Sequence, residues 1–278
     1  MSSPTVVTMS KGGAPRAAAV RELIHRAADC GWLARIDGRV VVQVGAAGRS
    51  AAIVETAQAV AGALRESGAD WVVEVRDAEP AAAAEACVDL QGQGGARVRV
   101  PRAWFEPFFL ITVAAPHPDR RWRIAASLRA QADTLMACNP GVPAAMLLAE
   151  AHRLGGADLA IVCGKHRTAG EWWGASSSAV QLEGAVARAA GLRPAALPAI
   201  AVIARHELLE PWDETVALPD LLDVPRGAAG AALGAARERA TGASRRAIED
   251  GARIVRNLRK VPQALRRRLA ARAARQLA

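Results

Sequence analysis

Residues 39–75 read RVVVQVGAAGRSAAIVETAQAVAGALRESGADWVVEV, and this stretch decides the fold. The β-branched run at 40–44 ends at Gly45 and is typical of a buried strand. Residues 51–66 place their apolar side chains on one helical face, with Ser50 as the N-cap and Gly68 as the stop signal. A second β-branched run follows at 71–75. Together these segments predict a strand–helix–strand unit with parallel strands.

The alternation of strand and helix patterns continues on both sides of this unit. We expect disorder over 1–16, a helix at 17–30, and, after the unit, helices at 80–87, 123–136 and 143–154. Strands are expected at 98–100, 108–113 and 158–163, with the apolar run 108–113 in a central position. The prediction is an α/β domain over 17–208, an open, mostly parallel doubly wound sheet with helices on both faces.

The pattern beyond residue 165 is less regular. We expect a loop beginning at Glu171, a short strand at 176–182 and a helix at 183–190, whereas 199–206 fits a strand or a helix equally. Three prolines predict a linker over 209–225. Residues 226–278 predict an arginine-rich helical tail, in which a narrow apolar stripe lies beneath a wide basic face.

Charge is divided unevenly along the chain. Residues 226–278 hold 14 Lys and Arg against three acidic residues, whereas the other 225 residues hold 22 against 24, so the net charges are +11 and −2. A concentrated basic segment at 243–278 favours an anionic surface, either a membrane or a nucleic acid. No aromatic residue is interleaved there to stack on bases. The apolar stripe equally favours docking on the protein itself or in a homodimer.

The cysteines and the termini exclude several classes of protein. Cys30, Cys87, Cys138 and Cys163 are 57, 51 and 25 residues apart, with no CxxC pair and no Cys/His couple of the structural-zinc kind. We therefore expect reduced thiols, and no pattern identifies a metal site or a cofactor. Because no signal-peptide h-region and no long apolar run are present, we expect a cytoplasmic protein, and the basic tail leaves a membrane-peripheral location open.

Polar loops follow three of the predicted strands at their carboxyl ends, where open α/β sheets bind ligands. In the first loop Gly45, Gly48 and Ser50 precede a helix N-terminus, whose N–H groups and dipole favour an anion. A plain strand-to-helix turn is the alternative, because the GxGxxG and P-loop patterns are incomplete. In the second loop His117 is a candidate proton carrier, and Arg120 and Arg121 are candidate anion ligands. The alternative there is a solvated loop.

The third loop, 163–168, gathers several reactive side chains. Nearby cations would lower the pKa of the Cys163 thiol if it faced solvent and make it a candidate nucleophile, although the last residue of an apolar strand is more often buried. His166 is a second candidate proton carrier, and Lys165 and Arg167 are candidate anion ligands. Trp172, one of two adjacent tryptophans that cannot both face one core, is a candidate to line or cover a pocket. The alternative is that both tryptophans pack the loop onto the domain.

The order and spacing of these segments from about residue 21 to 206 resemble the family called "domain of unknown function 362". The resemblance implies an α/β fold, but the family's polar positions are changed. Its Lys-Pro-Asn appears as Gln43-Val44-Gly45, its Leu-Lys-Asn as Leu128-Arg129-Ala130 and its Asp-Gly as Cys163-Gly164. Ala115 and His117-Pro118-Asp119 stand where the family has a Lys-x-Lys-x-His-like segment, and its cysteine-rich iron–sulfur module is absent.

Two functions from different classes remain open. One is a divergent enzyme of small-molecule, specialised metabolism, with biosynthesis as its setting, that binds an anionic or carbonyl-bearing metabolite between the three loops. The other is a non-catalytic binding or scaffold protein that associates with an anionic surface or a partner through its basic tail. The sequence does not identify the substrate, the reaction or the oligomeric state.

Overall fold

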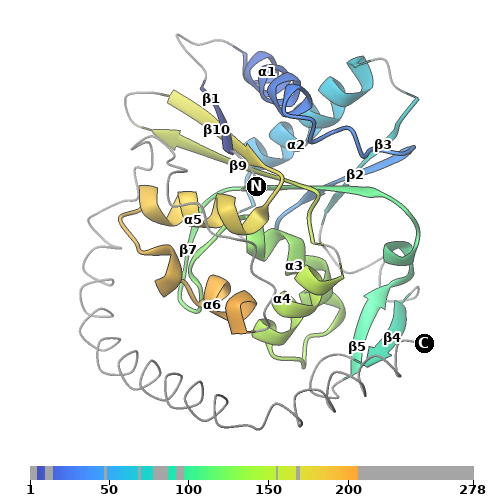
Figure 1. Ribbon diagram of the computed structural model, residues 1–278, viewed down its shortest axis with the longest axis vertical. Coiled ribbons are helices and arrows are strands. Elements are labelled where there is room, and N and C mark those ends of the chain that lie inside the picture. Colours follow the sequence, from blue (N-terminus) through green and yellow to red (C-terminus); the bar gives the residue numbers. More distant parts are fainter. Residues whose placement is uncertain are drawn as a thin grey trace, which may run out of the picture. The chain divides into compact units, whose positions relative to one another are not determined.

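The computed structural model of the protein describes residues 5–9, 15–46, 49–67, 70–77, 87–91, 97–154, 156–166 and 170–205. In this part of the chain a six-stranded sheet carries helices on both faces (Figure 1). The prediction of an α/β fold with a mostly parallel sheet is confirmed. The linker at 209–225 and the tail at 226–278 lie outside the described residues.

The main sheet is built from β1 (Thr5–Met9), β2 (Arg39–Val44), β3 (Val72–Asp77), β6 (Phe109–Ala114), β9 (Leu159–His166) and β10 (Gly170–Ser176). Their spatial order is β1-β10-β9-β6-β2-β3. The four strands β9, β6, β2 and β3 are parallel neighbours, and β6 is an inner strand, as predicted. β10 pairs antiparallel with β9 and with β1. β1 thus forms a strand within the segment that we expected to be disordered.

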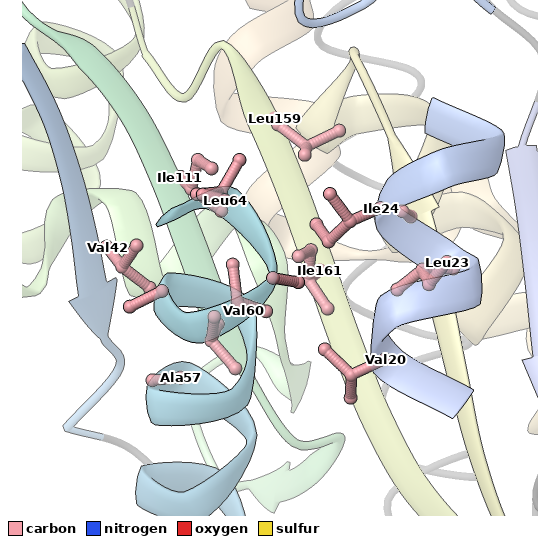
Figure 2. Packing of buried hydrophobic residues seen from close by; sticks show 14 of the residues in the cluster. Val20, Leu23, Ile24, Val42, Ala57, Val60, Leu64, Ile111, Leu159 and Ile161 are labelled. Carbon is pink, nitrogen blue, oxygen red and sulfur yellow. The ribbon is translucent and has the colours of Figure 1, made fainter. Parts of the chain in front are cut away.

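Two helices, α1 (Arg16–Asp29) and α2 (Ala51–Glu66), cover one face of this sheet. Both match their predicted positions closely. Figure 2 shows the side chains that α1 and α2 direct onto the inner strands, with Leu64 beside Ile111 and with Ile24 beside Ile161. The apolar face read from residues 51–66 is therefore the face that packs on β2 and its neighbours.

The opposite face carries α3 (Ser127–Cys138), α4 (Ala144–Arg153), α5 (Ala179–Ala189) and α6 (Pro198–Arg205) (Figure 1). α3 contacts β2, β6 and β9, and α5 contacts β9 and β10, while α4 packs against α3 and α6. A short 3-10 helix, η4 (Pro194–Ala196), joins α5 to α6. Residues 199–206, which the sequence left undecided, are helical as far as Arg205. None of the helices among the described residues has the length and apolar character needed to cross a bilayer.

Two small hairpins lie outside the main sheet. β4 (Cys87–Gln91) pairs with β5 (Arg97–Pro101), which holds the strand predicted at 98–100 and leads into the 3-10 helix η3 (Arg102–Phe105). The helix predicted at 80–87 is described only at Cys87, which belongs to β4. β7 (His117–Asp119) pairs with β8 (Arg123–Ala125), so the helix predicted from 123 begins only at Ser127.

The segment from Glu171 to Leu182 differs most from its prediction. It forms β10 and then the start of α5 at Ala179, rather than a loop and a short strand. The physical reason lies in the two adjacent tryptophans. Successive side chains of a strand point to opposite faces of the sheet, so a strand can bury both rings. Trp173 belongs to the core under α1 and α2, whereas Trp172 belongs to the core under α3 and α5, and each is 1% exposed. Two cores accept the two rings that one core could not.

Candidate functional site

The strand order reverses next to β2. From β2 the chain passes through α2 to β3 on one side, and the next parallel strand along the chain, β6, lies on the other side of β2. The helices that follow these two strands cover opposite faces, α2 one and α3 the other. The carboxyl ends of β2 and β6 therefore flank a topological switch point, the place where open α/β sheets bind ligands.

Helix α3 is fixed against the carboxyl end of β2 by close packing and by hydrogen bonds. A Cβ atom on Gly45 would lie 3.0 Å from the Cβ of Ala130, so glycine permits this approach. The Gln43 side chain donates to the Ala130 carbonyl at 2.6 Å and accepts from the Thr134 hydroxyl at 3.0 Å. Gly45 therefore serves the contact between strand and helix, a role that its position in the sequence did not indicate.

Asp133 and Arg129, neighbours on α3, meet the loop that follows β2. The Ala46 N–H donates to Asp133 Oδ2 at 2.7 Å, and Arg129 Nε donates to Asp133 Oδ1. The Asp133 side chain is 1% exposed and the Arg129 side chain 26% exposed. Arg129 contacts Asp133 through Nε. The two terminal nitrogens of Arg129 have no hydrogen-bond partner within the part of the chain that the structure describes. A buried carboxylate thus holds a guanidinium whose outer edge stays available.

The N-terminus of α2 borders the same loop. Ser50 is its N-cap, but among the described residues its side chain makes no capping hydrogen bond, and the first turn holds no acidic residue. The Arg49 N–H donates to the Ala46 carbonyl at 3.4 Å, and the Arg49 guanidinium donates to Asp77 at the end of β3 at 2.8 Å. The predicted anion loop is therefore bounded by α2 and by the Arg129–Asp133 pair, while Gly48 lies outside the described residues.

The second predicted loop forms the β7–β8 hairpin. Asp119 Oδ1 accepts the N–H groups of Arg121 at 2.7 Å and Trp122 at 2.8 Å, which closes the hairpin turn. His117, Arg120 and Arg121 are exposed. Among the described residues no hydrogen bond or ion pair joins these three side chains to the loop after β2 or to β9.

The third predicted loop is largely strand, because β9 continues to His166. Cys163 is 7% exposed and faces the core under α1 and α2, where its thiol donates to the Ala114 carbonyl at 3.5 Å. Burial raises the pKa of the Cys163 thiol to about 11, so the neutral thiol prevails near pH 7. The solvent-facing thiolate considered from the sequence does not form here. Arg167 and the side chain of His166 lie outside the described residues.

Lys165 is exposed and lies opposite Glu171 in the β9–β10 register. Glu171 binds Arg16, the first residue of α1, through two hydrogen bonds of 3.0 and 2.6 Å. These hydrogen bonds lower the pKa of Glu171, and Arg16 also pairs with Glu55 of α2. The cluster ties α1, α2 and β10 together beside the carboxyl end of β9.

Trp172 does not cover a pocket as a lid. Its indole lies on Gly164 of β9 so closely that a Cβ atom there would be 2.4 Å from the ring. The indole N–H is buried and has no hydrogen-bond partner within the described residues. Trp172 therefore packs against the sheet beneath α5. The geometry does not support the ligand-binding role that the sequence suggested for it.

Glu183, a residue of α5, sets the start of α3. Its Oε2 accepts the Leu128 N–H at 3.0 Å and the Ser127 hydroxyl at 3.0 Å, so a neighbouring helix supplies the acceptor that an N-cap residue would. The side chain is fully buried, and burial raises its pKa to about 7. Because α3 carries Arg129 and Asp133, this carboxyl group helps to place both of them. Nothing in the pattern of residues 183–190 indicates this contact.

Searches against protein-family models, curated proteins and solved structures find no match to this chain.

Proposed function

We propose that this protein binds the anionic group of a small metabolite at the carboxyl ends of β2 and β6. The observation that carries the proposal is Arg129, which Asp133 holds at the switch point with its terminal nitrogens unpartnered among the described residues. A guanidinium presents two parallel N–H donors to a carboxylate or a phosphate, and this geometry favours planar or tetrahedral anions. The uncapped N-terminus of α2 would add backbone N–H donors and a favourable dipole.

An enzyme of small-molecule metabolism is the class that we propose for this site. His117 and His166 are the candidate proton carriers, since His117 follows β6 and His166 is the last residue of β9, its parallel neighbour. Arg120, Arg121, Lys165 and Arg167 would attract the negative charge of the ligand toward that edge. Carbonyl-bearing metabolites that also carry a carboxylate or a phosphate would satisfy both requirements.

The test is a titration of the full-length protein with inorganic phosphate and with a panel of small carboxylates and organic phosphates, followed by calorimetry. Arg129→Lys keeps the charge but removes the fork, and Arg129→Ala removes both. We expect the dissociation constant of the best ligand to rise by at least about tenfold in Arg129→Lys and further in Arg129→Ala, the scale of one charge-assisted hydrogen bond. Unchanged binding by both variants would reject the site.

A second test is the double variant Arg121→Ala, Lys165→Ala, because both side chains are exposed. We expect its stability to change by no more than about 1 kcal/mol. If this variant loses anion binding while the Arg129 variants retain it, the ligand lies at the ends of β6 and β9 instead. That outcome would move the proposed site by one strand.

A second candidate function rests on charge. The contrast between a tail of +11 and a body of −2 favours a protein that associates with an anionic surface through residues 243–278. We propose this role as the alternative to metabolite binding. Binding of the full-length protein to anionic liposomes and to duplex DNA tests this role.

A further inference from the structure

The fold brings together two cysteines that are 51 residues apart in the sequence. Cys87 is the first residue of β4, and Cys138 is the last residue of α3. Their thiols are in hydrogen-bond contact. In the described structure they are not joined by a disulfide, and Cys138 is buried while Cys87 is half-buried. A disulfide needs this kind of approach, because only thiols whose carbon frames are already close can bridge without moving the backbone.

The surrounding contacts hold the two cysteines in place. Asn139, the residue after Cys138, accepts the Arg99 N–H at 2.7 Å and donates to the Arg99 carbonyl at 2.8 Å. Asn139 also donates to Leu135 of α3 at 2.8 Å, which fixes its amide to the end of that helix. Arg99 belongs to β5, and β5 pairs with β4 in a register that sets Cys87 opposite Pro101. The end of α3 and the β4–β5 hairpin therefore form one connected unit.

We propose that Cys87 and Cys138 form a reversible disulfide in exchange with low-molecular-weight disulfides. In the first step the Cys87 sulfur, as thiolate, attacks the small disulfide, forms a mixed disulfide and releases one small thiol. In the second step the Cys138 sulfur attacks the Cys87 sulfur, loses its proton and releases the second small thiol. The protein loses two protons and two electrons, and the small disulfide is reduced to two thiols.

Burial explains the order of these steps. The half-buried Cys87 is the accessible thiol of the pair. Burial, together with contact with the Cys87 thiol, raises the pKa of Cys138 to about 11, so Cys138 is a poor first nucleophile but lies next to the mixed disulfide. The disulfide would clamp the β4–β5 hairpin to α3, the helix that carries Arg129 and Asp133.

The experiment uses the full-length protein carrying Cys30→Ser, because the exposed Cys30 could otherwise link two molecules. The reduced protein is incubated with oxidised glutathione at pH 8, and intact mass and non-reducing peptide maps are recorded. We expect a loss of two hydrogen atoms, a peptide pair joined through Cys87 and Cys138, and full reversal by dithiothreitol. The unfolding temperature of the oxidised form should rise by several degrees, because the bridge closes a long loop.

Two variants define the pair. In Cys138→Ala we expect glutathione to stay attached to Cys87, since the resolving thiol is missing. In Cys87→Ser, a change at a half-buried position, we expect Cys138 to remain a free thiol. The proposal is overturned if the Cys30→Ser protein accumulates a glutathione adduct on Cys87 while Cys138 stays reduced, or if it resists oxidised glutathione altogether. Both of those outcomes are read without the variants, so a folding failure of Cys138→Ala does not affect them.

Discussion

The carboxyl group of Glu183 on α5 contacts the start of α3, so its charge state affects both helices. Its carboxyl group is fully buried, accepts hydrogen bonds from Ser127 and Leu128, and has one oxygen, Oε1, without a partner among the described residues. The protonated form fits this arrangement, because one oxygen accepts from the start of α3 while the other keeps its proton. Burial of the charged form is unfavourable and raises the pKa.

A pH dependence of stability follows from this group. Its pKa is raised from 4.5 to about 7, so the folded protein binds the proton more tightly than the unfolded chain. The stabilising effect is complete below about pH 4.5 and is lost as the pH rises through about 7. We expect the free energy of unfolding of the wild type to fall across this window, relative to Glu183→Gln, by an amount on the order of 3 kcal/mol. Urea denaturation at pH 5 and pH 8 measures it.

The glutamine variant is the appropriate comparison because its side-chain oxygen can still accept the Leu128 N–H, while it cannot ionise. Other titrating groups contribute equally to both proteins and cancel in the difference. Parallel stability profiles for wild type and Glu183→Gln between pH 5 and pH 8 would show that the carboxyl group is not protonated in the fold.

The role of Gly164 is steric. Because a Cβ atom there would lie 2.4 Å from the buried ring of Trp172, Gly164→Ala must displace either a tryptophan or the β9 backbone. We expect a loss of about 1–3 kcal/mol in the free energy of unfolding, the usual cost of overpacking. The control is Gly62→Ala on α2, where nothing lies within 4 Å and alanine should stabilise by up to about 1 kcal/mol. Chemical denaturation compares the two, and equal effects would contradict the close packing.

Among the elements, local patterns were sufficient where apolar residues form a continuous run or one continuous face. The stretch 39–75 predicted β2, α2 and β3 because two β-branched runs flank a segment whose apolar residues recur about every 3.6 residues. β10 was missed because both of its neighbouring tryptophans are buried, on opposite faces, which removes the alternation that marks a half-buried strand. The β7–β8 hairpin was missed because its strands have three residues each.

The candidate site was only partly predictable for a related reason. The edge of the sheet and the loop after β2 follow from the strand–helix–strand pattern, and Gly45 and Ser50 were named on that basis. Arg129 and Asp133 were not, since in the sequence they form an ordinary i, i+4 pair on a helix. Their position at the candidate site follows only from the packing of α3 across the end of β2. Contacts between elements, such as that of Asp133 with Ala46, leave no trace in local periodicity.

Over the whole chain, positive charge is concentrated in residues 226–278, which favours a role for this segment that is separate from that of the α/β region. The described α/β region ends with α6 at Arg205, so the described helices and the described residues of both cores lie before the predicted boundary at residue 225. We therefore expect a fragment of residues 1–225 to fold cooperatively, which circular dichroism and a single urea transition would show. This fragment is the control for the charge of the tail.

The basic tail is expected to bind anionic surfaces by electrostatic attraction. With +11 on residues 226–278 and −2 on the remainder, we expect the full-length protein to bind anionic liposomes or duplex DNA at low salt, and the 1–225 fragment to bind neither. Raising the ionic strength from about 0.05 to 0.5 M shortens the Debye length from roughly 14 to 4 Å and should release most of the protein. Co-sedimentation and gel-shift titrations at several salt concentrations measure both.

Release by salt reports only attraction, so liposomes and DNA must be compared at equal charge. A preference for liposomes is expected if the apolar stripe formed by Ile254, Leu258, Val261, Leu265 and Leu269 enters the membrane interface, as the apolar face of an in-plane amphipathic helix does. Replacing Leu258 and Leu265 with serine leaves the charge unchanged and should remove this preference while keeping the salt-sensitive attraction. If the full-length protein binds neither surface at low salt, an anionic surface is not its partner, and the stripe should then be tested for docking on the protein itself or on a second copy.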